Sequence, residues 1–300
     1  MPLIRETAQF YKSICKKGDD NLWHISIKPS TGQDEKGGVD QDDYLCALFS
    51  AKYCFQKALE YNLDEDGIYS EILRDGLAFP SLKSERVYYS SKGSGEKDYG
   101  KQKHPVQLND LAFLPVNNAI KEASDVAYRL RYEITQDAKR PYFYGWTLGE
   151  FLLAGSRIGN AVEWQKDWEN LRKADYVDPE WIQVYETSGV HKDSFYGITN
   201  GLITQSLLNN LVSDWFGKLE IAKCNPWEGK ISLKNIYSIL GVKIGGEIDG
   251  DYALLILTAW KDCEFEMHGE QIKLRKNEMI KLDLKSNAVS GWKIKKRHTD

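Results

Sequence analysis

Apolar side chains recur at steps of three and four residues over the first two thirds of the chain, a spacing that predicts amphipathic helices. In residues 3–17 the side chains with this spacing are Ile4, Ala8, Tyr11 and Ile14. The predicted helices are 3–17, 43–61, 69–76, 117–136, 146–160, 160–174 and 198–213.

Two long polar segments separate the first of these helices. Residues 23–43 and 84–103 are rich in Gly, Ser, Asp and Lys. A loop of that length inside a compact domain is usually functional or disordered. Helices that alternate with long loops are typical of an α-helical toroid whose connecting loops gather at one end, and we expect this fold for the first part of the chain.

The pattern changes at residues 225–229, Asn-Pro-Trp-Glu-Gly. Beyond them, short segments alternate between apolar and polar side chains, and turns rich in Gly, Asp and Asn separate these segments. Alternation with a period of two between turn residues predicts strands and hairpins, about six strands here. We therefore predict a mainly α plus β protein, with an α-helical toroid domain over 1–224 and a small all-β domain, a β-sandwich, over 225–300.

Charge and composition exclude several classes of function. The net charge is −4 and no long Lys/Arg block occurs, so the positive field that nucleic-acid binding requires is absent. No apolar run reaches the length of about 18 to 20 residues that spans a bilayer. The N-terminus lacks the apolar core of a signal peptide, which predicts a cytoplasmic protein, or a secreted one if the chain is a fragment. Aromatic residues form 12% of the chain, and flat rings of this kind suit sugars as well as a core.

The most specific motif is Asp-Ser-Phe-Tyr-Gly-Ile-Thr-Asn-Gly-Leu-Ile at residues 193–203. It resembles the motif Asp-Gly-Asn-Phe-Gly-Gly-Thr-Ala-Gly-Ile of the family 95 glycoside hydrolases, the inverting α-L-fucosidase family. Gly197, Thr199 and Gly201 fall in step with that motif. Residues 225–229 then stand where the family has a Pro/Trp/Gly-rich turn before its β domain.

Three further segments extend the resemblance, in the family's order, over most of the chain. Residues 2–11 and the Pro-Ser segment at 27–33 are similar to a helix of the family and to its substrate loop. Residues 104–115 share the first His and the last Pro of a His-rich segment. Residues 145–148, Gly-Trp-Thr-Leu, look like a Gly-Trp-Ser helix start in the family.

The resemblance implies an inverting glycoside hydrolase that acts on a glycan or oligosaccharide with a carboxylate-activated water and no cofactor. It also implies an (α/α)6 barrel, incomplete here because the family's N-terminal β domain and first barrel helices have no counterpart. The chain would then be a fragment, a truncated homologue or one piece of a split enzyme. An oligomer or a partner chain would complete the barrel.

Inverting hydrolysis requires two carboxyl groups about 6.5–9.5 Å apart, one as acid and one as base. Asp193 is the candidate base, because the matching Asp of the family holds the attacking water; its alternative role is to cap the helix that follows. The family's acid is a Glu followed by Trp, and no such pair occurs at the expected place. Glu85 is the candidate acid there, with a solvated loop carboxylate as its alternative. Glu150, four residues after Trp146, competes for the acid role, although a surface or capping Glu is more common at such a position.

The candidate substrate-binding residues are His104, Trp146, Trp23, His191 and Asn109. Both histidines lie in polar loops, where a His usually makes hydrogen bonds but can also bind a sugar hydroxyl or act as a base. The tryptophans suit stacking on a sugar face, and core packing is their alternative role. No His-Glu-x-x-His, Cys-x-x-Cys or close His/Asp cluster occurs, so we predict no metal site.

Two other function classes remain open. A glycan-binding or scaffold homologue without the acid would account for the missing Glu-Trp pair. A polysaccharide lyase, which helical toroids with β domains also host, would abstract a proton with Tyr185, Tyr196, His104 or His191.

Overall fold

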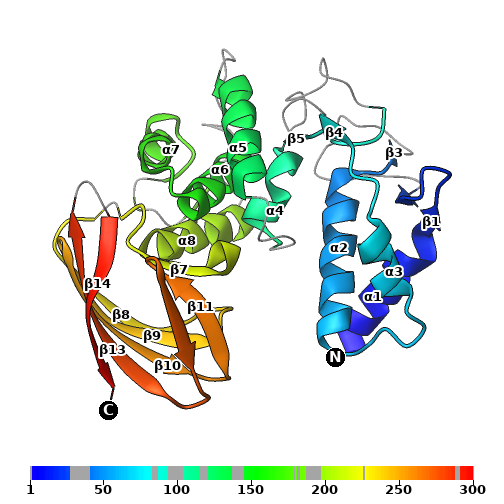
Figure 1. Ribbon diagram of the computed structural model, residues 1–300. Helices are drawn as coiled ribbons and strands as arrows, with labels where there is room; N and C mark the ends of the chain where they lie inside the picture. The colour runs from blue at the N-terminus through cyan, green and yellow to red at the C-terminus, as the bar shows by residue number, and fades with distance from the viewer. Residues whose placement is uncertain are drawn as a thin grey trace. The chain divides into compact units, whose positions relative to one another are not determined.

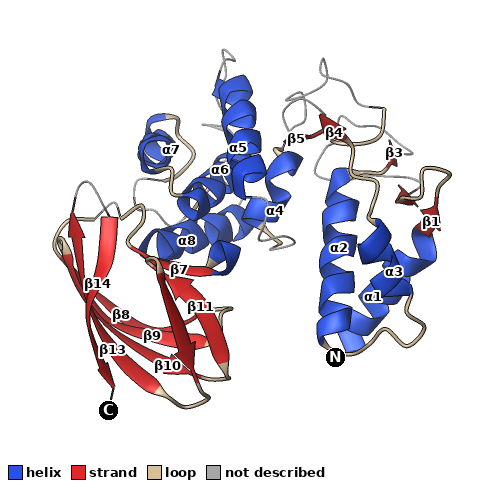
Figure 2. Ribbon diagram, in the orientation of Figure 1, coloured by secondary structure: helices blue, strands red, loops and turns tan. Residues whose placement is uncertain are grey.

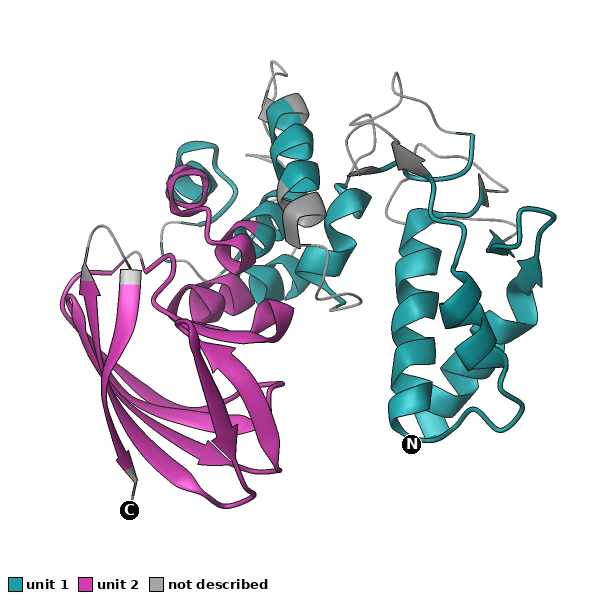
Figure 3. Cartoon of the chain, in the orientation of Figure 1, with its two compact units in different colours: residues 1–154, 167–203 teal, residues 155–166, 204–300 magenta. Residues whose placement is uncertain are grey.

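The computed structural model describes residues 2–27, 41–82, 87–93, 104–114, 121–136, 145–178, 180, 183–186, 197–225, 227–287 and 291–299. Helices are numerous in the first 211 residues and strands dominate after them (Figure 1, Figure 2). The chain divides into two compact units, one of residues 1–154 with 167–203 and the other of residues 155–166 with 204–300 (Figure 3).

Three helices form the N-terminal part of the first unit: α1 (Pro2–Ile14), α2 (Leu45–Glu60) and α3 (Ile68–Asp75). Their apolar faces share a core in which Ala8, Phe55 and Ile72 are fully buried. The bounds agree within three residues with the helices predicted over 3–17, 43–61 and 69–76. The apolar periodicity was sufficient here because each helix buries one continuous stripe.

A small antiparallel sheet accompanies these helices: β1 (Cys15–Lys17), β2 (Trp23–Ile27) and β3 (Gln41–Asp42). We predicted a polar loop over 23–43, and its first residues are instead a strand. Ile25 enters the core of α1–α3 while its backbone pairs with Cys15. The same pairing ends α1 at Ile14, three residues before the predicted end at residue 17.

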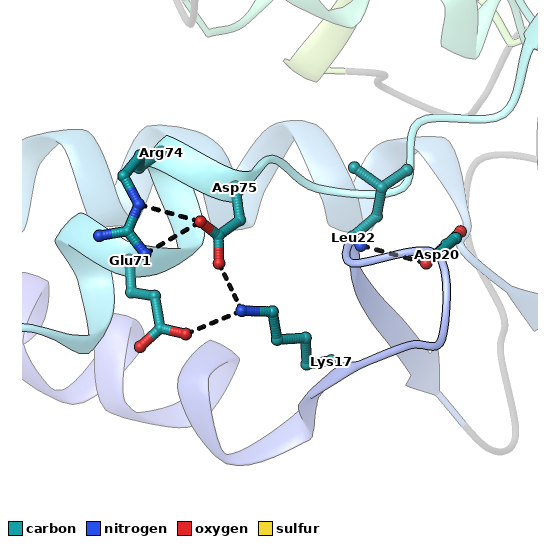
Figure 4. Close-up of polar contacts among 6 residues, drawn as sticks. All are labelled: Lys17, Asp20, Leu22, Glu71, Arg74 and Asp75. Carbon is teal, nitrogen blue, oxygen red and sulfur yellow. Dashed lines mark hydrogen bonds and ion pairs between the residues drawn. The ribbon is translucent and has the colours of Figure 1, made fainter.

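Exposed polar contacts connect β1 with α3 at the surface of the first unit (Figure 4). Lys17 Nζ lies 3.1 Å from Glu71 Oε1 and 2.7 Å from Asp75 Oδ2. In the turn after β1, the Leu22 N–H donates to the Asp20 carboxylate at 3.1 Å. Exposed ion pairs contribute little to the free energy of unfolding, so the core of α1–α3 rather than these contacts stabilises this part.

Asp43 is a buried carboxylate between β3 and α2. It is 1% exposed, and its Oδ1 accepts the Ile25 N–H at 2.9 Å while its Oδ2 lies 2.7 Å from His24 Nδ1. The other ring nitrogen of His24, Nε2, lies 3.1 Å from Asp20 Oδ1. Burial by itself would lower the pKa of His24, but the hydrogen bonds with Asp43 and Asp20 and their charges outweigh it and raise this pKa.

The segment after α3 packs against α2. It contains β4 (Ser81–Leu82), β5 (Val87–Tyr88), the 3-10 turn η2 (Val106–Leu108) and the short helix α4 (Asn109–Ala112). The rings of Phe49, Phe79 and Tyr88 have centroids 5.2 to 5.8 Å apart. Val106 is fully buried beside Phe49. Aromatic contacts thus hold Phe79 and β5 to α2, and Val106 joins η2 to the same cluster.

Four longer helices follow: α5 (Lys121–Gln136), α6 (Gly145–Ile158), α7 (Ala161–Lys173) and α8 (Gly197–Leu211). The predicted and observed ends of these helices agree within two residues wherever the predicted end lies in the described part of the chain. The predicted start at residue 117 is not compared, because residues 117–120 lie outside that part. Gly159 has a φ of 85° and follows the last residue of α6. A glycine in the left-handed conformation directly after the last helical residue is a common way for a helix to end. The conformation of Gly159 therefore explains the break between the predicted helices 146–160 and 160–174.

Strands make up most of the second unit: β6 (Val212–Ser213), β7 (Lys218–Ile221), β8 (Lys230–Tyr237), β9 (Val242–Asp249), β10 (Tyr252–Ala259), β11 (Cys263–Met267), β12 (Glu270–Leu274), β13 (Met279–Asn287) and β14 (Gly291–Thr299). The 3-10 turn η3 (Trp215–Gly217) joins β6 to β7. A five-stranded antiparallel sheet has the order β14-β13-β10-β9-β8. A four-stranded sheet has the order β12-β11-β7-β6, and in it β7 and β11 are parallel.

Both sheets contribute to one hydrophobic core. Along β10, Ala253, Leu255 and Leu257 are buried while the residues between them are not, which is the alternation that the sequence predicts. Leu219 from β7 and Met267 from β11 enter the same core and are fully buried. The α plus β class is therefore confirmed. Strands β6 and β7 already precede residue 225, and a domain boundary at 224/225 stays a prediction.

A buried arginine lies where the helices of the second unit end. The guanidinium carbon of Arg157 is 3.6 Å from the centroid of the Trp215 ring, and its Nε donates to Asn209 Oδ1 at 2.9 Å. Burial lowers the pKa of Arg157, and the charge of Asp214 offsets part of this effect. Stacking on a ring compensates a buried guanidinium for lost water, so these contacts fasten the end of α6 to the end of α8 and to η3.

No helix in the described part of the chain is long and apolar enough to cross a membrane. All five cysteines are among the described residues, and none is paired in a disulfide.

The raised pKa of His24 predicts a pH-dependent stability. The protonated ring is favoured in the folded state, so its contribution is fully present below the unfolded pKa of about 6.5 and is lost as pH rises through the higher folded value. Urea unfolding from pH 5 to pH 9 should show wild type losing stability relative to His24→Gln above about pH 6.5. If the difference in free energy of unfolding between wild type and His24→Gln stays constant over this pH range, Asp43 and Asp20 do not stabilise the protonated ring.

Candidate functional site

The start of α6 is a place of close backbone approach in the first unit. The Gly145 N–H donates to the Glu186 carbonyl at 2.7 Å, and a Cβ on Gly145 would lie 2.1 Å from the Tyr185 carbonyl oxygen. One turn later, a Cβ on Gly149 would lie 3.1 Å from Thr199 Cγ2 in the first turn of α8. The absence of side chains at these two positions lets residues 184–186 and α8 lie directly against α6.

Trp146 and His104, two of the predicted substrate-binding residues, meet at this end of α6. Their ring centroids are 5.2 Å apart with an angle of 34° between the planes. His104 is 5% exposed, and its Nδ1 lies 3.3 Å from the Thr147 hydroxyl. The Phe113 ring approaches Trp146 edge-on at 6.2 Å. His104 and Trp146, which are 42 positions apart in the sequence, are thus in aromatic contact.

Glu150 lies one turn after Trp146 on α6 and has no exposed surface. Arg131 of α5, also fully buried, supplies the opposite charge near it. Among the described residues, neither oxygen of Glu150 accepts a hydrogen bond of regular geometry, although the Trp146 indole is close enough to favour its charged form. We call Trp146, His104, Thr147, Glu150 and Arg131 the α6 cluster.

The electrostatics of the α6 cluster favour a protonated Glu150. Burial raises the pKa of this carboxyl group well above its usual range, and the charge of Arg131 and the Trp146 indole lower it only in part. A carboxylic acid that keeps its proton near neutral pH can donate that proton to a leaving group. From the sequence, Glu150 competes with Glu85 for the acid role, and a surface or capping position is its alternative. The structure excludes an exposed position.

The helices behind Glu150 pack through rings. Tyr128 and Tyr132 of α5 are stacked with centroids 5.6 Å apart, and Phe151 of α6 meets them edge-on at 5.7 and 5.4 Å. The Tyr132 hydroxyl donates to Asp167 Oδ1 of α7 at 3.0 Å. These contacts join α5, α6 and α7, and the burial of Glu150 within α6 removes the water that would stabilise its ionised form.

The remaining predicted site residues have different positions. Asp193, His191 and Glu85 lie outside the described residues, so their assigned roles stay predictions. Asn109 begins α4 and its Nδ2 donates to Cys46 Sγ of α2 at 2.8 Å. Trp23 lies in β2 and packs against the core of α1–α3, so its surroundings are those of a core residue rather than those of the α6 cluster.

Arg131 and Thr147 were not among the residues that the sequence singled out. A signal for Arg131 was present, because it shares a helix face with Tyr128, Tyr132 and Thr135 at steps of three and four residues. A cation on such a face requires a partner, and Arg131 donates to the Thr135 hydroxyl at 2.6 Å. Thr147 gave no signal, since a lone Thr in the first turn of a helix is common.

Among the described residues, no group of three or more His, Cys, Asp or Glu side chains is arranged to hold a metal ion. The α6 cluster itself combines one carboxyl group, one cation and two aromatic side chains, and this set suits proton transfer and the stacking of a flat ligand.

Comparisons with known proteins give a fold but no family. The sequence matches no protein-family model, and no curated protein is significantly similar to it. Solved structures do share its fold. One is a protein from the human microbiome provisionally named as a kojibiose phosphorylase, with a TM-score of 0.62 and 12% sequence identity.

The likeness to that protein covers 94% of this chain and 42% of the other. The chain therefore spans less than half the length of its structural neighbour. At 12% identity the likeness shows the fold alone, and it supports a toroid-type fold without pointing to the family 95 glycoside hydrolases in particular.

The close approach at Gly145 predicts a strong effect of one methyl group. Gly145→Ala should destabilise the chain by about 1–3 kcal/mol, because its Cβ would clash with the Tyr185 carbonyl, which is backbone and cannot turn away. Gly201→Ala on α8 is the matched control, since a Cβ there meets nothing within 4 Å. Ala favours a helix over Gly by about 1 kcal/mol, so the control should be neutral or stabilised in urea unfolding. Equal stability of the two variants would contradict the close approach.

The raised pKa of Glu150 predicts that stability falls as pH rises. The folded state keeps this proton after the unfolded chain has lost it, so the free energy of unfolding decreases by up to about 1.4 kcal/mol per pH unit between about pH 4.5 and the folded pKa. Glu150→Gln cannot ionise and should lose this slope. Urea unfolding of wild type, Glu150→Gln and the exposed control Glu133→Gln from pH 4 to pH 8 checks it. Parallel curves for wild type and Glu150→Gln would mean that Glu150 is ionised in the folded protein.

Proposed function

We propose that the chain is a carbohydrate-active enzyme, or part of one, that cleaves a glycosidic bond with Glu150 as general acid. The observation that carries this proposal is one fully buried carboxyl group with a raised pKa, one helical turn from an aromatic contact of Trp146 and His104. The fold likeness to a protein named as a disaccharide phosphorylase supports carbohydrate chemistry. In this proposal Glu150 replaces Glu85, the candidate acid of the sequence analysis.

The proposed reaction is hydrolysis with inversion. Glu150 donates its proton to the glycosidic oxygen as the bond between that oxygen and the anomeric carbon breaks. Water attacks the anomeric carbon from the opposite face, and Asp193, the proposed base, takes the proton of that water. Glu150 is left as a carboxylate and Asp193 as an acid, and exchange of one proton through solvent restores both.

Arg131 and Trp146 have distinct roles in this proposal. Arg131 stabilises the Glu150 carboxylate that remains after proton transfer, because it supplies the nearby positive charge. Trp146 is partly exposed while Glu150 is not, so the leaving oxygen reaches the carboxyl group when the Trp146 ring moves aside to stack on the sugar.

We also propose the finer architecture that the sequence suggested. The helices form an incomplete (α/α)6 barrel, and the two sheets form a β-sandwich. The coverage of 42% of the neighbouring chain supports an incomplete barrel that a partner chain or a second copy completes. An α-L-fucoside is the substrate that the motif at 193–203 favours.

A second candidate function is phosphorolysis. The neighbour is named as a kojibiose phosphorylase, and inorganic phosphate in place of water would attack the anomeric carbon while the same acid protonates the leaving sugar. No base is then needed, because phosphate is already ionised at neutral pH. The buried cation Arg131 is compatible with either nucleophile.

The experiment is a cleavage assay on aryl α-L-fucoside, other aryl glycosides and disaccharides, each with and without inorganic phosphate. Cleavage without phosphate indicates hydrolysis, and cleavage that requires phosphate indicates phosphorolysis. Glu150→Gln should lower the rate about 10²–10⁴-fold on disaccharides and far less on dinitrophenyl glycosides, whose leaving group needs no proton. A role of Glu150 in stability alone would lower both rates equally.

Glu133→Gln, exposed on α5, is the control and should keep the wild-type rates. If Glu85→Gln rather than Glu150→Gln shows the dependence on the leaving group, Glu85 is the acid and our assignment is wrong. Absence of any cleavage by wild type would favour the glycan-binding homologue, and an absorbance rise from an unsaturated product would favour the lyase.

A further inference from the structure

A hollow of about 520 Å³ opens in the second unit, formed by residues of β7, β11, β13 and β14 and the turns next to them. Its volume lies within the range of about 300–1,000 Å³ that small-ligand sites occupy. We call it the β-unit pocket. None of its lining residues belongs to the α6 cluster.

Two ion pairs line one side of the β-unit pocket. Lys218 Nζ lies 2.8 Å from Glu266 Oε1, which the parallel register of β7 and β11 places directly opposite. Lys223 Nζ lies 2.6 Å from Glu220 Oε2, and these two side chains are 19% and 29% exposed. Each pair offers a hydrogen-bond donor, the ammonium group, next to an acceptor, the carboxylate. Adjacent hydroxyl groups on a sugar ring both donate and accept hydrogen bonds, so this arrangement suits them.

Trp292 supplies an aromatic surface to the same pocket. Register places it directly opposite Ser286, next to the connection that joins β13 to β14. Part of the indole packs against the core of the two sheets, which fixes the ring, and the remainder lines the pocket. A ring held by packing can stack on the apolar face of a sugar with little loss of side-chain entropy.

His268 completes the polar lining. It and Gly269 form the two-residue turn between β11 and β12, with φ values of 48° and 83°. Two positive φ values are characteristic of the tight hairpin turn that matches strand twist, so the turn places the backbone of His268 at the pocket. Its buried Nε2 has no hydrogen-bond partner among the described residues, and burial lowers the pKa of this imidazole. Because Nε2 is buried, His268 contributes to the wall of the pocket rather than bonding a ligand through this atom.

We propose that the β-unit pocket binds one neutral sugar unit of a glycan, with Trp292 under the ring and the Lys223–Glu220 pair on its hydroxyl groups. This goes beyond the proposed cleavage, since it assigns a separate non-catalytic site that does not require Glu150 to act as an acid.

The chemistry of the lining favours a neutral sugar over the alternatives. The positive charges of Lys218 and Lys223 are neutralised by their partners Glu266 and Glu220. These two carboxylates would repel a phosphate or a carboxylate ligand. A purely apolar ligand would remove water from the two ion pairs and would offer them no hydrogen bonds in return. Lys293, another lining residue, is exposed and makes no ion pair within the described residues, so it can interact with the next unit of a glycan chain.

Calorimetric titration of the full chain with maltohexaose, cellohexaose and xylohexaose tests this proposal. At least one of them should bind, and Trp292→Ala should weaken that binding about tenfold or more, as truncation of a central aromatic contact usually does. Trp260→Ala is the matched control, because Trp260 is 44% exposed in the same unit and does not line the pocket. It should bind as wild type does.

Trp292 also contacts the core, so Glu220→Gln is a second variant that keeps the packing of Trp292 and should weaken binding as well. Glu150→Gln should bind normally even where it no longer cleaves, which separates this site from the proposed cleavage. The proposal is overturned if no oligosaccharide binds, if Trp292→Ala or Glu220→Gln binds as Trp260→Ala does, or if only hexagalacturonate or inorganic phosphate binds.

Discussion

The close approach of the chain to the start of α6 is the constraint on which the candidate site depends. A Cβ on Gly145 would meet the Tyr185 carbonyl oxygen at 2.1 Å, and one on Gly149 would meet the first turn of α8 at 3.1 Å. Both positions lie on one side of α6, so the chain contacts the helix backbone there. Trp146 and Glu150 follow them by one residue each and therefore share the adjacent face. The local geometry of the α6 cluster follows from these two glycines.

Burial then gives Glu150 its chemical character. A carboxyl group without exposure loses the water that would stabilise its charge, and Arg131 restores only part of that loss. The β-unit pocket follows a different principle. Its Lys and Glu side chains remain partly exposed and already paired, so they stay charged and present donors and acceptors without a large change in pKa. One site is thus suited to proton transfer and the other to recognition.

The sequence predicted most of the helices because each buries a continuous stripe, and a stripe is a local property of the chain. It missed β2 and placed the all-β part after residue 224, although β6 and β7 precede that position. Both errors have one cause. Such short strands form because another segment pairs with them, as β1 does with β2 and β11 does with β7. No periodicity within three to five residues reveals that partner.

For the site, the sequence by itself determined that Trp146 and Glu150 share a helix face, because residues four apart on a helix lie on the same side. The order of residues also showed that a His lies in the preceding loop segment. Only the tertiary structure decided that His104 meets Trp146, that Arg131 lies near Glu150 and that Glu150 is fully buried. The pKa of a carboxyl group depends on the dielectric and the charges around it in space. Those surroundings come from α5 and the chain around residue 104, which are brought to α6 by folding and not by their place in the sequence.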